Sequence, residues 1–198
     1  MTRRRAARAA TIHAVLGATS DLIEERGVEA TTVRDIANAA QVSVGTVMSV
    51  GDKDALIVRV VDAMIEAEHR ARRSAPPPHR AEGGCAERAF ALIWPFAAMF
   101  AHRLELGRRY AAILVTGRHS SRVFTELAGH LVRELREVFE DCAHDAAVPT
   151  HERAQCLYRT YIGTLFAWAA APEPRESELR AALRHSCALA CPLPKESP

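Results

Sequence analysis

Few side chains in this sequence are placed to do catalytic or metal chemistry. His151 and Glu152 begin the pattern of a helical zinc site, but Gln155 stands where the second histidine would have to be. Cys187 and Cys191 share one face of a helix, yet zinc needs four ligands and the sequence does not supply the others. The chain also lacks a glycine-rich phosphate loop and a G-x-S-x-G nucleophile motif. The sequence therefore predicts a protein that is not an enzyme and that uses no metal or cofactor.

The sharpest pattern suits recognition of DNA. Thr32 and Ser43 are each suited to cap a short helix, and Val42 fits a buried position in the tight turn around Gln41. This is the layout of a helix-turn-helix, whose second helix lies in the major groove. The second helix carries small residues, which let its backbone approach the bases closely: Val44, Gly45, Thr46 and Ser49. The same spacing also fits a helical hairpin without a DNA-binding role.

Composition narrows the class of protein further. The 198 residues carry a net charge of +2, which alone does not indicate a nucleic-acid binder, and 48% hydrophobic residues exclude wholesale disorder. The longest apolar run, 89–101, is interrupted by Pro95 and is shorter than the ~20 residues of a membrane span. The basic N-terminus lacks the apolar stretch of a signal peptide. We therefore expect a cytoplasmic protein without membrane association, whose five cysteines are thiols.

Apolar residues recur at helical spacing along almost the whole chain, so we predict an all-α fold. A first helix ends at Gly27, and further helices begin after Thr32, Ser43 and Asp52. A proline-rich linker follows at 74–84. Later helices are predicted near 85–102, 105–117, 120–146, 150–171 and 175–190. The predicted domains are a three-helix head (1–51), a connecting helix (52–73) and a helical body for ligand binding and dimerisation (74–198).

The head resembles the DNA-binding domain of the tetracycline-repressor (TetR) family. The runs that carry this resemblance are Thr32–Ala37, Val42–Val47 and Lys53–Leu56, within about residues 8–65. The body resembles the family only in length and in the number and order of its helices. The resemblance implies a homodimeric transcriptional regulator, usually a repressor that a small ligand releases from a palindromic operator in double-stranded DNA.

The resemblance also implies roles for single residues. Thr32 would hold a phosphate, Arg34 would face the groove or the backbone, and Lys53 would pin a phosphate at the start of the fourth helix. Basic residues before the first helix either contact DNA or form a solvated start. The remaining predicted DNA-binding residues are Arg3, Arg4, Arg5, Arg8, Ser43, Val44, Gly45, Thr46, Met48 and Ser49.

Three departures from the family pattern alter this region. The family usually has glycine at Gln41 and tyrosine at Met48, and the stretch from Gly45 to Lys53 is one residue shorter, without an aromatic pair near Val50. A glutamine forced to positive φ would cost about 1 kcal/mol relative to glycine. These departures leave open a helical small-molecule-binding protein with weakened or lost DNA binding. A DNA-binding regulator without a small-molecule effector is a further alternative.

The helix predicted at 150–171 favours a dimer. After Arg159 it is apolar or small nearly all round, so it must be covered on several sides. A second subunit would cover it economically and form a four-helix bundle with the following helix, whereas burial inside a monomer is the alternative. The predicted interface residues are Cys156, Thr160, Gly163, Ala167, Ala170, Leu179, Leu183 and Leu189.

The middle helices hold most of the large aromatic residues, and Pro95 is expected to bend one of them. Bent helices leave space between them, so we predict a mainly apolar pocket for a small apolar or aromatic effector. Core packing is the alternative for any single aromatic side chain. The predicted lining residues are Val60, Met64, Trp94, Phe100, His102, Tyr110, Phe124, His130, Tyr161 and Leu165.

Overall fold

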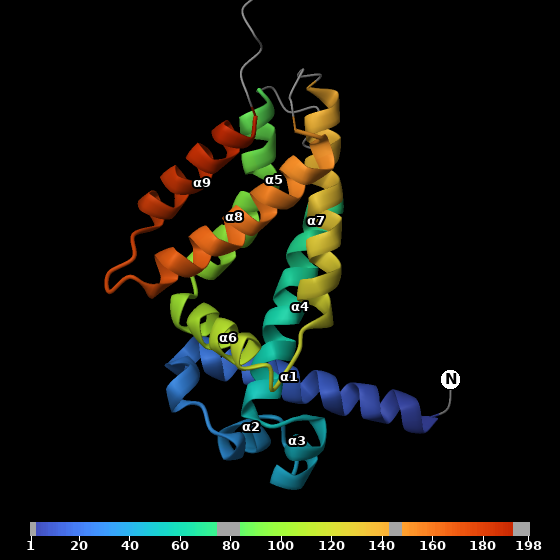
Figure 1. Ribbon diagram of the computed structural model, residues 1–198. Helices are drawn as coiled ribbons and strands as arrows, with labels where there is room; N and C mark the ends of the chain where they lie inside the picture. The colour runs from blue at the N-terminus through green and yellow to red at the C-terminus, as the bar shows by residue number, and fades with distance from the viewer. Residues whose placement is uncertain (1–2, 75–83, 143–147, 192–198) are drawn as a thin grey trace, which may run out of the picture. The chain divides into compact units, whose positions relative to one another are not determined.

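The computed structural model describes residues 3–74, 84–142 and 148–191, and within these ranges it contains helices and no strand. The helices are α1 (Arg3–Ala30), α2 (Val33–Ala39), α3 (Val44–Val50), α4 (Lys53–Ser74), α5 (Cys85–Ala101), α6 (Leu104–Thr116), α7 (Arg122–Asp141), α8 (Thr150–Ala170) and α9 (Glu176–Ala190) (Figure 1). The predicted all-α fold is confirmed. None of the helices in this part of the chain combines the length and hydrophobicity needed to cross a bilayer.

The chain divides into two compact units. The first holds α1 to α3, α4 up to Met64, and α6, which packs on α1. The second holds α4 from Ile65 onward together with α5, α7, α8 and α9. The predicted linker at 75–83 and the predicted helical residues 143–146 lie outside the described residues. The functional division at residues 51 and 73 stays a prediction.

The helices of the first unit begin where the sequence predicts. Thr32 caps α2 in a capping box, because its side chain accepts from the Asp35 N–H and the Asp35 carboxylate accepts from the Thr32 N–H at 3.0 Å. The Thr32 hydroxyl also donates to the Asp35 carboxylate, at 2.6 Å, and this bond together with that from the Thr32 N–H lowers the pKa of Asp35. Ser43 caps α3 by accepting from the Thr46 N–H at 3.0 Å. Asp52 likewise caps α4.

An apolar core holds these short helices together. Val15 and Leu22 of α1 pack with Ile36 of α2, Val47 of α3 and Leu56 of α4. Val42, predicted as a buried plug, is half-buried against the same cluster. Each helix thus contributes few core residues. Because Val47 fixes which face of α3 is buried, it also fixes which face is exposed.

Gly27 interrupts α1, although helical turns resume and continue to Ala30. Its φ of 83° lies in the region that favours glycine, and the Thr31 hydroxyl donates to its carbonyl at 2.8 Å. A Cβ at this position would lie 3.1 Å from a Glu105 carboxylate oxygen. The predicted break at Gly27 is confirmed, with one further turn beyond it.

Gln41 ends α2 in a left-handed conformation, with φ of 54°. Its N–H donates to the Asn38 carbonyl at 3.2 Å, and the Val42 N–H donates to the Ala37 carbonyl at 3.0 Å. This is a Schellman motif, in which glycine is the preferred residue at the position of Gln41. The motif explains why the family pattern has glycine there.

Replacing Gln41 by glycine should therefore raise the free energy of unfolding by about 1 kcal/mol, because it removes backbone strain. Gln41→Ala is the matched control, since alanine keeps the Cβ and hence the strain. Urea unfolding followed by circular dichroism would measure both. Equal stabilisation by alanine would show that the left-handed backbone is not the cause.

The second unit is a layer of packed helices. α8 packs against α7 and α9, and α5 packs against α7 and α9. Leu135 and Phe139 of α7, Leu157 of α8, and Leu183 of α9 are almost fully buried. Pro95 lies inside α5, which continues through it as one helix to Ala101. The framework formed by these helices positions the pocket described below.

Candidate nucleic-acid interface and ligand pocket

The exposed face of α3 consists of the residues that the sequence singles out. Val47 is 0% exposed and anchors the helix, whereas Met48 on the other side is 50% exposed. A Cβ placed on Gly45 would meet only the Ser43 hydroxyl, at 3.7 Å. The predicted contact residues with exposed side chains or backbone are Ser43, Val44, Gly45, Met48 and Ser49, and Thr46 is half-buried. This short face is small enough for a close approach to a flat or grooved partner.

Hydrogen bonds fix the polar side chains of α3. The Ser43 and Thr46 hydroxyls lie 2.8 Å apart, and the Ser49 hydroxyl donates to the Thr46 carbonyl at 2.7 Å. Thr46 is therefore held by its neighbour rather than free to rotate. Such preorganised side chains lose little entropy when they meet a ligand.

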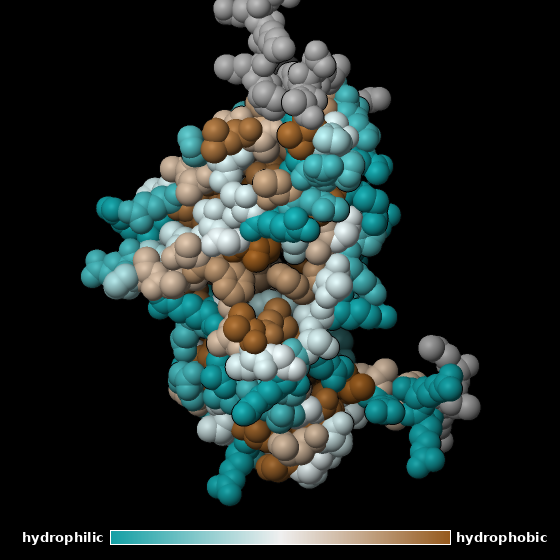
Figure 2. Space-filling view, viewed as in Figure 1, coloured by the Kyte–Doolittle hydropathy of each residue, from teal (hydrophilic) through white to brown (hydrophobic). Residues whose placement is uncertain are grey.

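Other elements of the first unit carry exposed basic side chains. Arg4, Arg5 and Arg8, predicted to lie before the first helix, are instead part of α1, because the helix already begins at Arg3. They are exposed on its first turns, which extend beyond α2 and α3 and have a hydrophilic surface (Figures 1 and 2). The side chain of Arg3 lies outside the described residues. Arg34 is exposed as well, and Thr32 is exposed at the start of α2. The surface can therefore attract a polyanion.

Lys53 is half-buried at the start of α4, and its Nζ donates to the Glu29 carbonyl at 3.4 Å. This is a long hydrogen bond, so a phosphate could compete for the ammonium group. The assignment of Lys53 to DNA stays a prediction.

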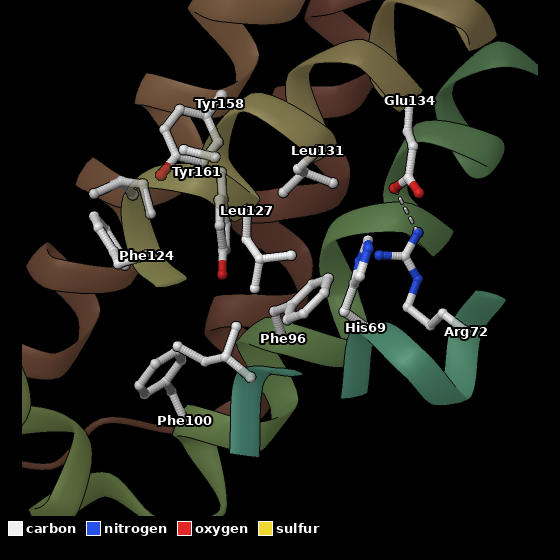
Figure 3. Close-up of a pocket in the computed structure, with 13 residues that line it drawn as sticks. His69, Arg72, Phe96, Phe100, Phe124, Leu127, Leu131, Glu134, Tyr158 and Tyr161 are labelled. Atoms are coloured by element: carbon white, nitrogen blue, oxygen red, sulfur yellow. Dashed lines mark hydrogen bonds and ion pairs between the residues drawn. The ribbon is translucent and has the colours of Figure 1, made fainter. Parts of the chain in front are cut away.

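A pocket lies within the second unit, among α4, α5, α7 and α8 (Figure 3). Its walls are mainly aromatic and aliphatic, and the space among them is about 40 Å³. Most of the lining comes from Ile65, Phe96, Phe100, Phe124, Leu127, Ala128, Leu131, Tyr158, Tyr161 and Ile162. Because ligand pockets of drug-sized molecules measure roughly 300–1,000 Å³, a ligand has to displace some of these side chains.

One end of the pocket is polar. His69 and Arg72 of α4 face Glu134 of α7, and Arg72 Nη2 donates to Glu134 Oε2 at 3.0 Å (Figure 3). Burial lowers the pKa of His69, which favours its neutral imidazole. The Arg72 guanidinium also lies 5.1 Å from the centre of the Phe96 ring. The rest of the lining is apolar apart from the hydroxyls of Tyr158 and Tyr161, so the pocket suits an amphipathic molecule.

Arg72 keeps one donor without a partner. Its Nη1 is buried, and no protein group in the described ranges accepts a hydrogen bond from it. A buried donor left unpaired costs about 1–3 kcal/mol, more when it is charged. This atom is therefore the group in the pocket with the most to gain from a ligand.

Only part of the predicted ligand set lines this pocket. Phe100, Phe124 and Tyr161 do so, whereas Leu165 is buried in the helical core. His130 lies beside the pocket, with its ring 5.4 Å from that of His69.

The other predicted ligand residues lie elsewhere. Val60, Met64 and Tyr110 belong to the first unit, and the Tyr110 hydroxyl donates to Asp62 at 3.1 Å. Trp94 stacks under the guanidinium of Arg180, 3.9 Å from its ring centre. His102 is exposed and lies 3.3 Å from Glu176. For Tyr110, Trp94 and His102 the physical reason is that their side chains find these partners instead of facing the pocket.

Sequence reasoning missed His69, Arg72 and Glu134. A signal for the first two exists in α4, where the buried residues Val61 and Ile65 are followed at helical spacing by His69 and Arg72. An apolar stripe that ends in polar residues marks a change from core to site. Nothing in the sequence singles out Glu134 among the other acidic residues of its helix.

The small face of α8 is exposed, as a dimer interface requires. Cys156, Thr160, Gly163, Ala167 and Ala170 all lie on the surface of the single chain, which is largely white to brown over this helix (Figure 2). No atom lies within 4 Å of a Cβ placed on Gly163. The face therefore has room for the side chains of another helix.

The α9 residues of the predicted interface divide into two groups. Leu189 is 72% exposed and can meet a partner. Leu179 and Leu183 are 0% exposed in the single chain, because they pack inside the second unit. They have no surface to offer to another subunit, so their predicted role is corrected to one in the core.

Three of the five cysteines, Cys85, Cys187 and Cys191, are buried. All five are free thiols, and Cys85 Sγ lies 2.7 Å from Cys191 Sγ. Desolvation raises the pKa of Cys142 to about 11 and that of Cys187 to about 12, so both are protonated at pH 7. No group of three or more metal-ligating side chains occurs within 3–74, 84–142 and 148–191.

Comparisons with known proteins agree with the geometry of the first unit. Residues 15–60 match the family model described as bacterial regulatory proteins, tetR family. This segment contains the core residues of α1, the capped helices α2 and α3, and the start of α4. No curated protein sequence matches the chain.

Solved structures share the fold over most of the chain. Thermus thermophilus FadR, a TetR-family transcriptional repressor solved in complex with lauroyl-CoA, is 20% identical, with a TM-score of 0.59 over 94% of this chain and 97% of that one. A TetR transcriptional regulator from Rhodococcus sp. RHA1 is 16% identical, with a TM-score of 0.60 over 92% and 96%. A further transcriptional regulator from Rhodococcus sp. Rha1 is 21% identical, with a TM-score of 0.57 over 90% and 95%.

Proposed function

We propose that this chain, of which residues 15–60 match the tetR family of bacterial regulatory proteins, is a ligand-responsive repressor of that family. A homodimer binds a palindromic operator through α3 of each subunit. A small, mainly apolar molecule in the pocket of the second unit releases it. The observation that carries this proposal is the apolar pocket lined partly by α4, the helix whose first turn carries Lys53.

The proposed DNA binding rests on the exposed face of α3 and on the exposed arginines of the first unit. Gly45 and Ser43 permit close approach to the bases, and Arg34 and the arginines of α1 supply positive charge. Positive side chains near phosphates release counterions, which gives affinity without sequence preference. Sequence preference then comes from the side chains that reach base edges, and we predict that Thr46 is one of them.

The proposed dimer rests on the exposed small face of α8 and on Leu189 of α9. An isologous dimer places two recognition helices about a two-fold axis, and the operator then has two half-sites related by the same symmetry. Small residues allow the α8 helices to approach closely, so the packed area is large for the number of side chains involved.

The proposed regulation of DNA binding by a ligand rests on α4. Ile65, His69 and Arg72 line the pocket, and Lys53, which the family pattern assigns to a phosphate, begins the same helix. A ligand that displaces pocket side chains shifts α4 and so changes the spacing of the two recognition helices. Coupling between two sites is typically ~1–3 kcal/mol, a change in DNA affinity of roughly 5–150-fold. The complex of the similar Thermus thermophilus repressor with lauroyl-CoA supports a small-molecule effector.

A gel shift with the promoter region upstream of the protein's own gene, repeated over a salt series, tests DNA binding. We expect affinity to fall steeply with salt, and replacement of Arg3, Arg4, Arg5 and Arg8 by alanine to flatten the dependence, because fewer counterions are released. Arg118→Ala, an exposed arginine of the same unit outside the predicted surface, is a single-site control.

An unchanged salt slope in the variant that lacks the four arginines would show that these side chains do not contact DNA. Absence of any shift with the wild-type protein, at low salt as well, would favour the alternative of a small-molecule-binding protein that has lost DNA binding. The altered stretch from Met48 to Gly51 is the feature that makes this alternative worth testing.

A further inference from the structure

We infer that the pocket takes an uncharged hydrophobic molecule carrying a carbonyl oxygen, and that Arg72 recognises this oxygen through Nη1. The inference rests on the proposed function only in treating the pocket as the effector site. It names a ligand class that follows from the arrangement of Arg72, Glu134 and the aromatic walls.

The first argument is that the two terminal nitrogens of the Arg72 guanidinium have different hydrogen-bonding partners. Nη2 donates to Glu134 Oε2 at 3.0 Å, while Nη1 is buried and has no acceptor among the residues that the structure describes. Figure 3 shows the nitrogen bonded to Glu134 on one side and the other terminal nitrogen turned toward His69. Glu134 and Phe96 hold the group in place from two sides, so Nη1 is a fixed donor at the edge of an apolar space.

The second argument is the charge of this end of the pocket. The carboxylate of Glu134 already balances the charge of Arg72, whose side chain is 14% exposed. A ligand carboxylate at Nη1 would lose its hydration, and it would lie on the same guanidinium as Glu134, a group of like charge. A carbonyl oxygen accepts the hydrogen bond without adding a charge, so it fits where an anion does not.

The third argument is the character of the remaining walls. Phe100, Phe124, Leu127 and Ile162 offer no hydrogen bonds from their side chains, so the part of the ligand that they cover must be hydrophobic. The rings of Tyr158 and Tyr161 stand 6.3 Å apart and add flat surface. Together these side chains favour a flat apolar body with its oxygen at the Arg72 end.

Three probes of nearly the same shape test this: 2-acetonaphthone, 2-ethylnaphthalene and 2-naphthoate. They present to Arg72 a ketone, a hydrocarbon and a carboxylate. Equilibrium dialysis of the full-length protein, without DNA, measures their affinities. We expect the ketone to bind at least about tenfold more tightly than the other two, because only the ketone pairs the buried donor without adding charge.

The double variant Arg72→Met/Glu134→Gln removes the donor and the charge that it balances. It should retain binding of 2-ethylnaphthalene and lose the preference for the ketone. The matched control is Arg70→Met/Glu66→Gln, which removes an exposed pair on the same helix, with 3.8 Å between Arg70 Nη1 and Glu66 Oε2. This control should keep the full preference. Circular dichroism of both variants checks their folding.

Several results would overturn the inference. These are tightest binding of 2-naphthoate, equal binding of ketone and hydrocarbon by the wild type, and failure of all three probes to bind. A ketone preference that survives in the double variant but disappears in Tyr161→Phe would reassign the donor to Tyr161. If the double variant is unfolded, the three wild-type affinities still test the ligand class, and Tyr161→Phe still tests whether Tyr161 is the donor.

The same probes separate this inference from the proposed function. Repeating the dialysis with a bound operator tests the coupling between pocket and DNA. A ketone that binds through Arg72 with equal affinity in the presence and absence of operator would leave the ligand class intact and refute the regulatory mechanism. Operator binding without any preference for the ketone would refute the ligand class and leave the proposed DNA binding intact.

Discussion

Replacing Gly45 by glutamate is expected to weaken operator binding by at least about 100-fold while leaving the fold intact. The new carboxylate would stand on the exposed face of α3, where the proposal places DNA. Like charges brought together at an interface cost several kcal/mol, and each 1.4 kcal/mol is a factor of ten in affinity. Fluorescence anisotropy with a labelled operator would measure the change. The Cβ itself meets only Ser43, at 3.7 Å, so little stability should be lost.

Gly17→Glu is the matched control for this variant. Gly17 lies in α1, and a Cβ there would meet no atom within 4 Å beyond its chain neighbours and its own helix backbone, so the same change in charge is made outside α3 and outside the residues predicted to contact DNA. Its effect should be limited to the loss expected from one unit of net charge at a distance. If Gly45→Glu and Gly17→Glu weakened DNA binding equally, α3 would not be the recognition helix.

The second large effect is expected for Gly163→Arg. This change places a long, charged side chain in the middle of the small face of α8, and a symmetric dimer receives it twice. An uncompensated buried charge costs about 3–5 kcal/mol, so the dimer dissociation constant should rise by more than about 100-fold. Analytical ultracentrifugation over a range of protein concentrations would detect the shift to monomer. Operator affinity should fall with it, because one half-site holds a monomer weakly.

Gly129→Arg controls for the substitution itself. Gly129 is exposed on α7, and a Cβ there would meet only Arg133 Nη1, at 3.7 Å. This variant should remain a dimer. A wild-type protein that is monomeric at micromolar concentration, or a Gly163→Arg variant that stays dimeric, would show that α8 is not the interface.

The fold could be predicted to within a few residues of most helix ends, because the signals are local. Thr32, Ser43 and Asp52 each cap a helix through their own side chain, and this chemistry is visible in the residue type and its spacing. The strain at Gln41 could be anticipated in the same way, from a turn that favours glycine. The place of α6 in the first unit could not be predicted, because its contact with α1 depends on residues far apart in the sequence.

The pocket was harder to predict than the helices. Helical periodicity shows which residues are buried, but it does not show which buried residues share a cavity. Trp94 illustrates the difficulty, since an aromatic residue beside Pro95 finds its partner in Arg180, more than eighty positions away. The polar end was missed for a related reason. Arg72 and Glu134 are ordinary charged residues until the fold brings them together.

The narrowness of the pocket has a consequence for the rate at which the proposed ligand binds. A space of about 40 Å³ has room for water molecules but not for a naphthalene ring. Entry then waits for a rare conformation in which side chains such as Phe96 and Phe124 have moved apart. The observed rate should therefore reach a plateau as ligand concentration rises, set by the opening of the protein rather than by diffusion. Once those side chains close around the ligand, escape requires the same opening, so the complex should persist long after free ligand has been removed.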